Sequence, residues 1–219
     1  LLALGRLLEP WFGRLRVLVV HSERVPEAER PHSLEELADP RWKGRLGWAP
    51  GNGSFQAHVS ALRSVWGEER TRAWLQGVSA NAPTVYPKNS PQVEAAGSGA
   101  IDVGWVNHYY LYKFDHQALG VVNHSFEPGD AGNLMMLSGA GIRAGSAQAE
   151  AAETVVAFLV SETAQQYFAE QTREYPTRPG VSTHPDVPAI APEALVVVPQ
   201  DALADVGATR TMLQELGLQ

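Results

Sequence analysis

Two neighbouring tyrosines, Tyr109 and Tyr110, carry the most distinctive metal chemistry in this sequence. They follow residues 101–106, an apolar segment with the composition of a buried strand. A phenolate oxygen is a hard anionic donor that suits a small, highly charged ion such as Fe(III), and a bound cation acidifies a phenol whose free pKa is about 10. The competing interpretation is packing at a sheet rim, because tyrosine buries its ring and leaves its hydroxyl in water. Taken alone, the two residues favour packing. His108 beside them is a candidate for a further ligand, but a histidine between two other polar residues more often faces solvent, which is the expectation here.

The second candidate is a set of neutral polar residues in loops beside predicted helices and strands: Asn52, Gly53, Ser54, Asn89 and Asn107. The first three precede a predicted helix. Glycines let an anion approach the backbone, and the free N–H groups of a helix start point at it, so carbonate or phosphate would fit there. An ordinary turn capped by Ser54 is the commoner use of such a loop, and each asparagine suits a turn equally well.

Composition removes several classes of function. The chain has 219 residues, no cysteine and a formal net charge of −7, with no basic block. Thiolate catalysis, disulfides, Fe–S clusters and Cys-ligated zinc are excluded, and nucleic-acid binding is disfavoured. Ser54 and His58 share a helix face but lack a G-x-S-x-G turn, and no H-E-x-x-H, P-loop or dinucleotide fingerprint occurs. The residues therefore give little support to an enzymatic function.

The elements that would position these residues alternate between strand and helix, which predicts an α/β fold with parallel crossovers. Strands are expected at residues 15–20, 46–49, 101–106, 118–123 and 134–139. Helices are expected at residues 1–12, 55–66, 68–77, 90–97, 147–160, 162–171 and 201–216, with Gly77 as a C-cap, Ser90 as an N-cap and Ser161 as another. In an open α/β sheet, ligands lie beyond the carboxyl ends of strands, where the polar loops would converge. No apolar run approaches the roughly 20 residues of a membrane span.

The order of several short segments resembles the ferric-iron-binding proteins of bacterial ABC uptake systems, within the periplasmic solute-binding superfamily. The matching segments are residues 14–19, 39–47, 49–55, 73–75, 86–90, 102–104, 107–110 and 174–176. Each is modest alone, but the collinear series covers nearly the whole chain and reverses the preference on the tyrosine pair.

The resemblance implies a type II periplasmic-binding-protein fold of two lobes that close on a hinge. Fe(III) would be held by Tyr109 and Tyr110. A synergistic anion, carbonate or phosphate, would lie against Asn52, Gly53 and Ser54, with Asn89 and Asn107 helping. The implied partner is an ABC transporter permease, and the implied location is periplasmic or extracytoplasmic. The alternatives within this fold and outside it are capture of another small solute and a truncated, non-binding interaction domain.

Two departures from the family pattern bear on affinity. Roughly the first hundred residues of a typical member are missing, judged against a normal domain length, and with them a His and a Glu that one branch gives to the metal. Another branch has a further tyrosine where this chain has Phe55. Two tyrosines and an anion leave Fe(III) short of six ligands, so we expect weak or absent iron binding by this chain alone.

The lobe assignment follows from the same resemblance. Residues 20–130 are expected to form one complete lobe. Residues 1–19 and 131–219 are expected to form the rest of an incomplete first lobe, with hinge crossings near residues 19 and 130. Losing part of a lobe exposes sheet edges and apolar helix faces, so a homodimer or a segment swap between chains is expected to compensate.

Overall fold

A computed structural model describes residues 4–219, which fall into two compact units. The smaller unit combines the described part of Leu1–Arg14 with Met135–Ile190, and the larger combines Leu15–Leu134 with Ala191–Gln219. The chain therefore leaves the larger unit after residue 134 and returns to it at residue 191. The assignment of residues 20–130 and of the flanking segments to the family's two lobes stays a prediction.

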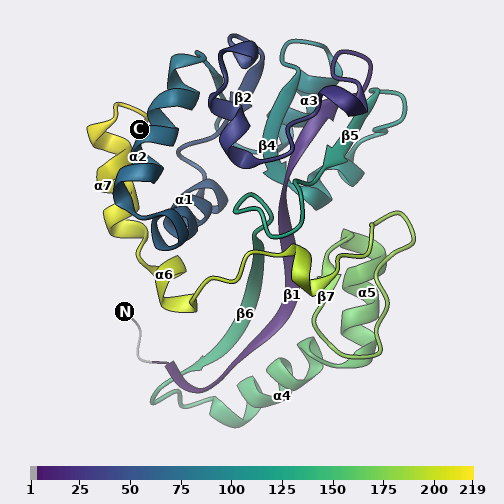
Figure 1. Ribbon diagram of the computed structural model, residues 1–219. Coiled ribbons are helices and arrows are strands. Elements are labelled where there is room, and N and C mark those ends of the chain that lie inside the picture. Colours follow the sequence, from purple (N-terminus) through teal and green to yellow (C-terminus); the bar gives the residue numbers. More distant parts are fainter. Residues whose placement is uncertain (1–3) are drawn as a thin grey trace. The chain divides into compact units, whose positions relative to one another are not determined.

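The larger unit is built on a mixed sheet with strand order β3-β2-β4-β1-β5 (Figure 1). These strands span Thr84–Val85, Leu46–Trp48, Val103–Asn107, Leu4–His21 and Val121–His124. Strand β2 is parallel to β3 and β4, as the alternation of strand and helix predicts. Strand β1 is antiparallel to both β4 and β5, so the prediction of a parallel sheet holds for only part of it.

Helices α1, α2 and α7 of the larger unit gather to one side of its sheet (Figure 1). The α-helices of this unit are α1 (Gly53–Trp66), α2 (Glu68–Ala80), α3 (Ser90–Gly97), α6 (Gln200–Ala204) and α7 (Val206–Glu215). Its 3-10 helices are η1 (Glu27–Glu29), η2 (Leu34–Ala38), η3 (Pro40–Trp42), η4 (His108–Lys113) and η5 (Pro192–Ala194). The predicted single helix over residues 201–216 is instead two, because the chain breaks at Asp205, whose side chain caps Ala208.

Gly77 does not end a helix, contrary to the prediction. Helix α2 continues to Ala80, with Asn81 as its C-cap. A Cβ on Gly77 would lie 2.8 Å from the Cβ of Ala38, which is too close for two carbon atoms. The glycine therefore lets α2 pack tightly against η2. Asn89, and not Ser90, occupies the N-cap position of α3.

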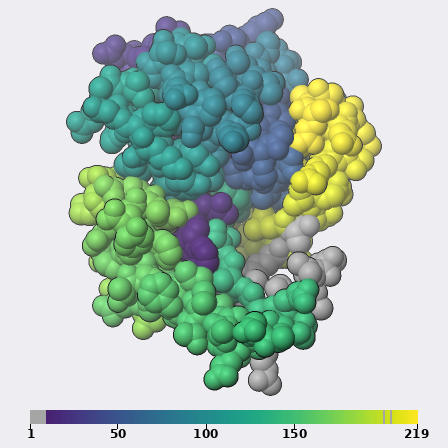
Figure 2. Space-filling model, turned by 180° about the vertical axis from the view of Figure 1, so that it is seen from behind, coloured from purple at the N-terminus to yellow at the C-terminus, as the bar shows by residue number. Residues whose placement is uncertain are grey.

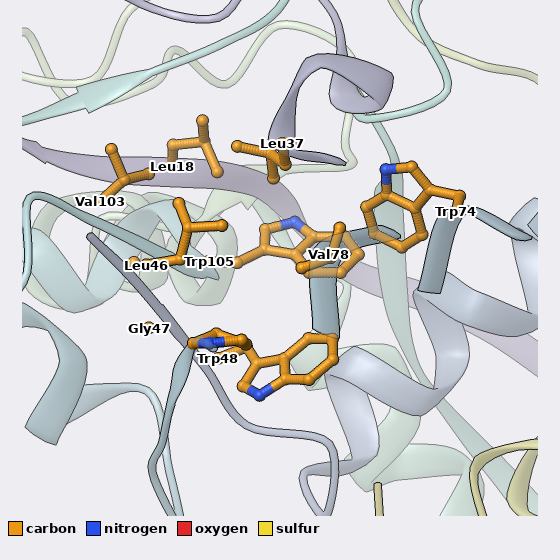
Figure 3. Close-up of a pocket in the computed structure, with 11 residues that line it drawn as sticks. Leu18, Leu37, Leu46, Gly47, Trp48, Trp74, Val78, Val103 and Trp105 are labelled. Atoms are coloured by element: carbon orange, nitrogen blue, oxygen red, sulfur yellow. The ribbon is translucent and has the colours of Figure 1, made fainter. Parts of the chain in front are cut away.

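Aromatic side chains fill the core of the larger unit. Phe55 and Trp74 each meet Trp105 edge-on, with ring centroids 4.9 Å and 5.5 Å apart, a favourable aromatic geometry. The rings of Trp48, Trp74 and Trp105 and neighbouring aliphatic side chains line an apolar void of about 10 Å³ (Figure 3). A void of this size holds at most one water molecule and offers that water few partners. It is a packing defect of the core and not a solute site.

The sequence predicts a helix over residues 1–12. Residues 1–3 lie outside the described residues, and for residues 4–12 the prediction is wrong. Strand β1 covers Leu4–His21 as one strand of 18 residues. Its first part pairs with β6 (Met135–Arg143) and with β7 (Tyr175–Pro176), Phe12 facing Pro176 in the β7 pairing. Leucine-rich segments follow their tertiary partners, and here two neighbouring strands override the helical spacing.

The smaller unit adds two helices to these strands, α4 (Ala149–Leu159) and α5 (Glu162–Thr172). Ser161 caps α5 through Ala164, as predicted. Among the described residues of α4, only Val156 is buried, whereas Val155 and Phe158 are exposed, as is Tyr167 on α5. Figure 2 shows the outer surface that these helices form. Within residues 4–219, no helix is both long and apolar enough to cross a bilayer.

Candidate functional site

Tyr109 and Tyr110 lie in η4, the 3-10 helix that begins where β4 ends. Their rings stack, with centroids 4.5 Å apart and planes inclined by 28°. Both residues are only partly buried, so solvent reaches each of them. A run of six residues is long for a 3-10 helix, whose hydrogen bonds are poorer than those of an α-helix. The predicted position of the pair at a strand end is confirmed, and its role in metal binding stays a prediction.

A cation already lies beside the tyrosine pair. The Lys113 ammonium is 5.2 Å from the ring centroid of Tyr109 and 4.6 Å from that of Tyr110. The faces of aromatic rings attract positive charge, which accounts for this contact. The Lys113 ammonium therefore places positive charge beside the tyrosine pair, which would disfavour a metal ion bound at the hydroxyls.

His108 is buried, so the expectation that it faces solvent is wrong. Its Nδ1 accepts a hydrogen bond of 3.1 Å from the backbone N–H of Leu15, which puts the ring proton on Nε2. The Asn123 side chain donates to the His108 carbonyl at 2.8 Å. These bonds tie the start of η4 to β1 and β5. With Nδ1 accepting from Leu15 and the ring proton on Nε2, neither ring nitrogen has a lone pair available for a metal ion.

The polar loop residues meet at the start of α1. Asn52, and not Ser54, is the N-cap: its Oδ1 accepts the Ser54 N–H at 3.0 Å and the Ser54 hydroxyl at 2.6 Å. Asn89 donates from Nδ2 to Ser54 Oγ at 3.5 Å. Asn89 and Asn107 are buried, Asn52 and Ser54 are half-buried, and Gly53 is exposed. The exposed face of the cluster is therefore the turn that begins α1.

Arg16 joins this cluster, and the sequence reasoning missed it. The antiparallel register of β1 and β4 sets Arg16 opposite Asn107, and Nη1 donates to Asn107 Oδ1 at 3.0 Å and to Ser54 Oγ at 3.3 Å. Nη2 donates to the Trp105 carbonyl at 2.9 Å, and the side chain is 0% exposed. The available signal was a charged residue inside an apolar strand, since such residues are rarely buried without partners.

His58, one helical turn beyond Ser54, is not a base for that serine. The ring is fully buried, and Nε2 lies 2.8 Å from the Ala131 carbonyl, to which it donates. Burial, and next the positive charge of Arg16, lower the pKa of His58 to about 3. The imidazole is therefore neutral at physiological pH. The Ser54 hydroxyl donates its hydrogen bond to Asn52 Oδ1 instead.

The donor set of the described residues favours phenolate ligation over a carboxylate–histidine site. Among residues 4–219, no three His, Asp or Glu side chains group in a way that could hold a metal ion. Phe55 does not add to the donors, because its side chain has no oxygen, and its ring packs in the core against Trp48 and Trp105. Tyr109 and Tyr110 are the side chains of this region best suited to a hard cation.

Comparison with known proteins identifies ferric-iron-binding proteins among the relatives of this chain. The family model described as "Bacterial extracellular solute-binding protein" matches residues 5–205. The chain is 30% identical over 215 residues to the major ferric iron-binding protein of Neisseria meningitidis, covering 94% of this chain and 63% of that protein. It is 31% identical over 183 residues to the Fe(3+)-binding periplasmic protein of Serratia marcescens, covering 80% and 54% respectively. The chain therefore spans less than two thirds of the length of these relatives.

Solved structures agree on the fold. Iron-bound HitA from Pseudomonas aeruginosa superposes with a TM-score of 0.89 at 30% identity, covering 96% of this chain and 69% of that one. Apo FutA2 from Synechocystis superposes with a TM-score of 0.83 at 29% identity, covering 97% and 71%. The predicted fold class, an α/β periplasmic-binding-protein fold with an incomplete lobe, is confirmed by this partial coverage at high similarity.

Proposed function

We propose, from the premise that this chain belongs to the bacterial extracellular solute-binding protein family, that it captures Fe(III) outside the cytoplasm for an ABC transporter permease. Tyr109 and Tyr110 would bind the ion, and a carbonate or phosphate would lie at the start of α1. The observation that carries the proposal is the stacked, solvent-reached tyrosine pair. The iron-binding relatives, which are non-enzymatic binding proteins, support the choice of solute.

The chemistry follows from the charges. Each phenol gives up its proton to become a phenolate ligand, so two protons are released for each Fe(III) bound through the pair. The ion then retains positive charge and empty coordination positions. An oxyanion fills some of these positions and offsets part of the charge. The anion-facing residues Asn52, Gly53 and Ser54 lie at a helix N-terminus, where the backbone favours negative charge.

Affinity is expected to be low. Two phenolates and one anion do not complete the six positions that Fe(III) commonly uses, and the Lys113 ammonium adds positive charge beside the tyrosine pair. We expect the two charges to repel each other, so that Lys113 swings away when iron binds. The segment of the relatives that this chain does not span is the natural source of further ligands.

Titration of the chain with ferric citrate tests the proposal. A visible tyrosinate-to-iron charge-transfer band is expected, saturating only at high ferric citrate concentration. The Tyr109→Phe and Tyr110→Phe variants should each weaken or lose the band. The matched control is Tyr167→Phe, because Tyr167 is an exposed tyrosine on α5 and should leave the band unchanged.

Three outcomes contradict parts of this proposal. Absence of the band at every accessible iron concentration removes the tyrosine assignment. A band that persists in both variants would show that iron binds at a site other than Tyr109 and Tyr110. Tight, stoichiometric colour in the unmodified chain would show that the argument from incomplete coordination is wrong.

A further inference from the structure

We infer that Arg16 is a positioning residue that sets the polarity of the anion subsite by forcing the Ser54 hydroxyl to act as a donor. The inference rests on the proposed function, since it concerns the same anion. It goes further by naming which residue makes this end of α1 select an oxyanion over a cation. The ligand class is a small oxyanion with at least two free oxygens, such as phosphate or carbonate.

The argument begins with the chemistry of the guanidinium group. Arginine offers only N–H donors and has no acceptor. Ser54 Oγ, at 3.3 Å from Arg16 Nη1, must therefore accept there. Asn89 Nδ2, at 3.5 Å, also donates to the same oxygen. A hydroxyl has two acceptor positions and one proton, so the proton of Ser54 is left for the remaining direction.

That remaining direction faces the start of α1. The Ser54 hydroxyl donates to Asn52 Oδ1 at 2.6 Å, and the Ser54 backbone N–H donates to the same oxygen at 3.0 Å. Two donors thus converge on one oxygen at a helix N-terminus. In this structure Asn52 Oδ1 occupies that point, and an anion oxygen bound by Ser54 would take its place.

Arg16 is itself held so that it cannot turn away. Nη1 also donates to Asn107 Oδ1 at 3.0 Å, and Nη2 donates to the Trp105 carbonyl at 2.9 Å. The guanidinium carbon lies 5.1 Å from the centre of the Trp105 ring. The group is wholly buried, where the low dielectric strengthens each of these contacts. Because a guanidinium stays charged at all ordinary pH values, the donor arrangement does not depend on pH.

The inference predicts the effect of changing the head group while keeping its charge. In Arg16→Lys, a single ammonium cannot span Ser54, Asn107 and the Trp105 carbonyl together, so the Ser54 proton is no longer directed. We expect the affinity of the metal-free protein for inorganic phosphate to fall about tenfold, the loss of one hydrogen bond to a charged group. Isothermal titration calorimetry at fixed ionic strength measures this.

A double-mutant cycle separates positioning from general damage. Ser54→Ala should lower phosphate affinity by about the same factor, and Arg16→Lys combined with Ser54→Ala should bind no more weakly than Ser54→Ala alone, because Arg16 acts through Ser54. Additive losses, or unchanged affinity in Arg16→Lys, would overturn the inference. Arg70→Lys is the matched control, since Arg70 is exposed and pairs with Glu35, and it should not alter phosphate affinity.

Further readouts keep the inference falsifiable. If Arg16→Lys does not fold, as thermal unfolding would reveal, Ser54→Ala alone tests the inference, because unchanged phosphate affinity in that variant would overturn it. Failure of the unmodified protein to bind phosphate would overturn this inference while leaving the tyrosine charge-transfer band intact. Absence of that band with normal phosphate binding would overturn the iron proposal alone.

Discussion

Hydrogen-bond direction at a few buried residues organises the candidate site more than net charge does. Arg16 can only donate, and His58 is held neutral with one ring proton committed to the Ala131 carbonyl. Each of these side chains fixes which partner donates and which accepts in the hydrogen bonds that it makes. A buried polar network of this kind specifies one arrangement because any reversed hydrogen bond would leave a group unsatisfied.

His58 makes the stability of the protein sensitive to acid. Its pKa is about 3 in the folded chain, against an ordinary value of 6.5. Between about pH 3 and pH 6.5, His58 is therefore protonated in the unfolded chain and neutral in the folded chain. The stabilisation is complete above pH 6.5 and is lost as the pH falls toward 3, by up to about 1.4 kcal/mol for each pH unit.

His58→Gln removes this titration while keeping an N–H donor for Ala131. Urea unfolding at several pH values between 7 and 4 should show a shallower loss of stability than in the unmodified protein. The control is His32→Gln, because the His32 side chain is 65% exposed. Parallel pH profiles for His58→Gln and the unmodified protein would show that the buried imidazole does not titrate as described.

At this residue level, the sequence placed Asn52, Ser54, Asn89 and Asn107 in one region but could not identify Arg16 as the residue that connects them. Its partners come from β4, about 90 positions along the chain, and from the first turn of α1. Local composition presents Arg16 as an interruption of an apolar strand. Only the register of β1 against β4, which sets Arg16 opposite Asn107, reveals that Arg16 contacts the polar cluster.

Among the elements, those defined by local signals were predicted well. Ser161 and α5 have the expected cap, and β4 leads into a helix at the tyrosine pair as expected. Elements whose state depends on distant partners were not. The segment before Arg14 is a strand because β6 and β7 pair with it, and Gly77 serves close packing and not a helix end.

Asp102 anchors the start of β4 and therefore the element that carries the tyrosines. It pairs with Arg24, which follows β1, and with Arg45, which precedes β2. Burial raises the pKa of Asp102, but the hydrogen bonds and charges of Arg45 and Arg24 lower it further, so that it lies below its usual value. The stabilisation is thus present above the ordinary carboxyl pKa and is lost as the pH falls below it.

Asp102→Asn should cost about 2 kcal/mol of unfolding free energy at pH 7, because two guanidinium groups then lose their shared anion. Chemical denaturation followed by tryptophan fluorescence measures it. Glu94→Gln, an exposed position on α3, should change stability by less than about 0.5 kcal/mol. Equal effects of the two substitutions would show that the Asp102 pairs add little.

On the scale of the whole molecule, the two compact units differ in how much apolar surface they bury. In α1 of the larger unit, seven residues are buried, whereas α4 of the smaller unit buries Val156 alone among its described residues. The sequence anticipated exposed apolar helix faces from the family resemblance. It could not identify which helix would carry them, because exposure depends on which neighbours are present.

Hydrogen exchange should resolve this difference. Amides of α4 and α5 are expected to exchange faster than those of α1 and β4, because few buried contacts oppose local opening. Mass spectrometry of the native protein after timed exchange measures it, with peptides from α1 as the internal reference. Equal protection in α1 and α4 would show that the smaller unit is as cooperative as the larger.

The single long strand β1 has a consequence for how this sequence can vary. Phe12 is paired with Pro176 in one unit and Arg16 with Asn107 in the other, so the spacing between them is fixed at both ends. One inserted or deleted residue between these positions would turn every later side chain to the opposite face of the strand. Length changes that surface loops absorb easily are therefore forbidden here, and drift in this segment is confined to substitutions.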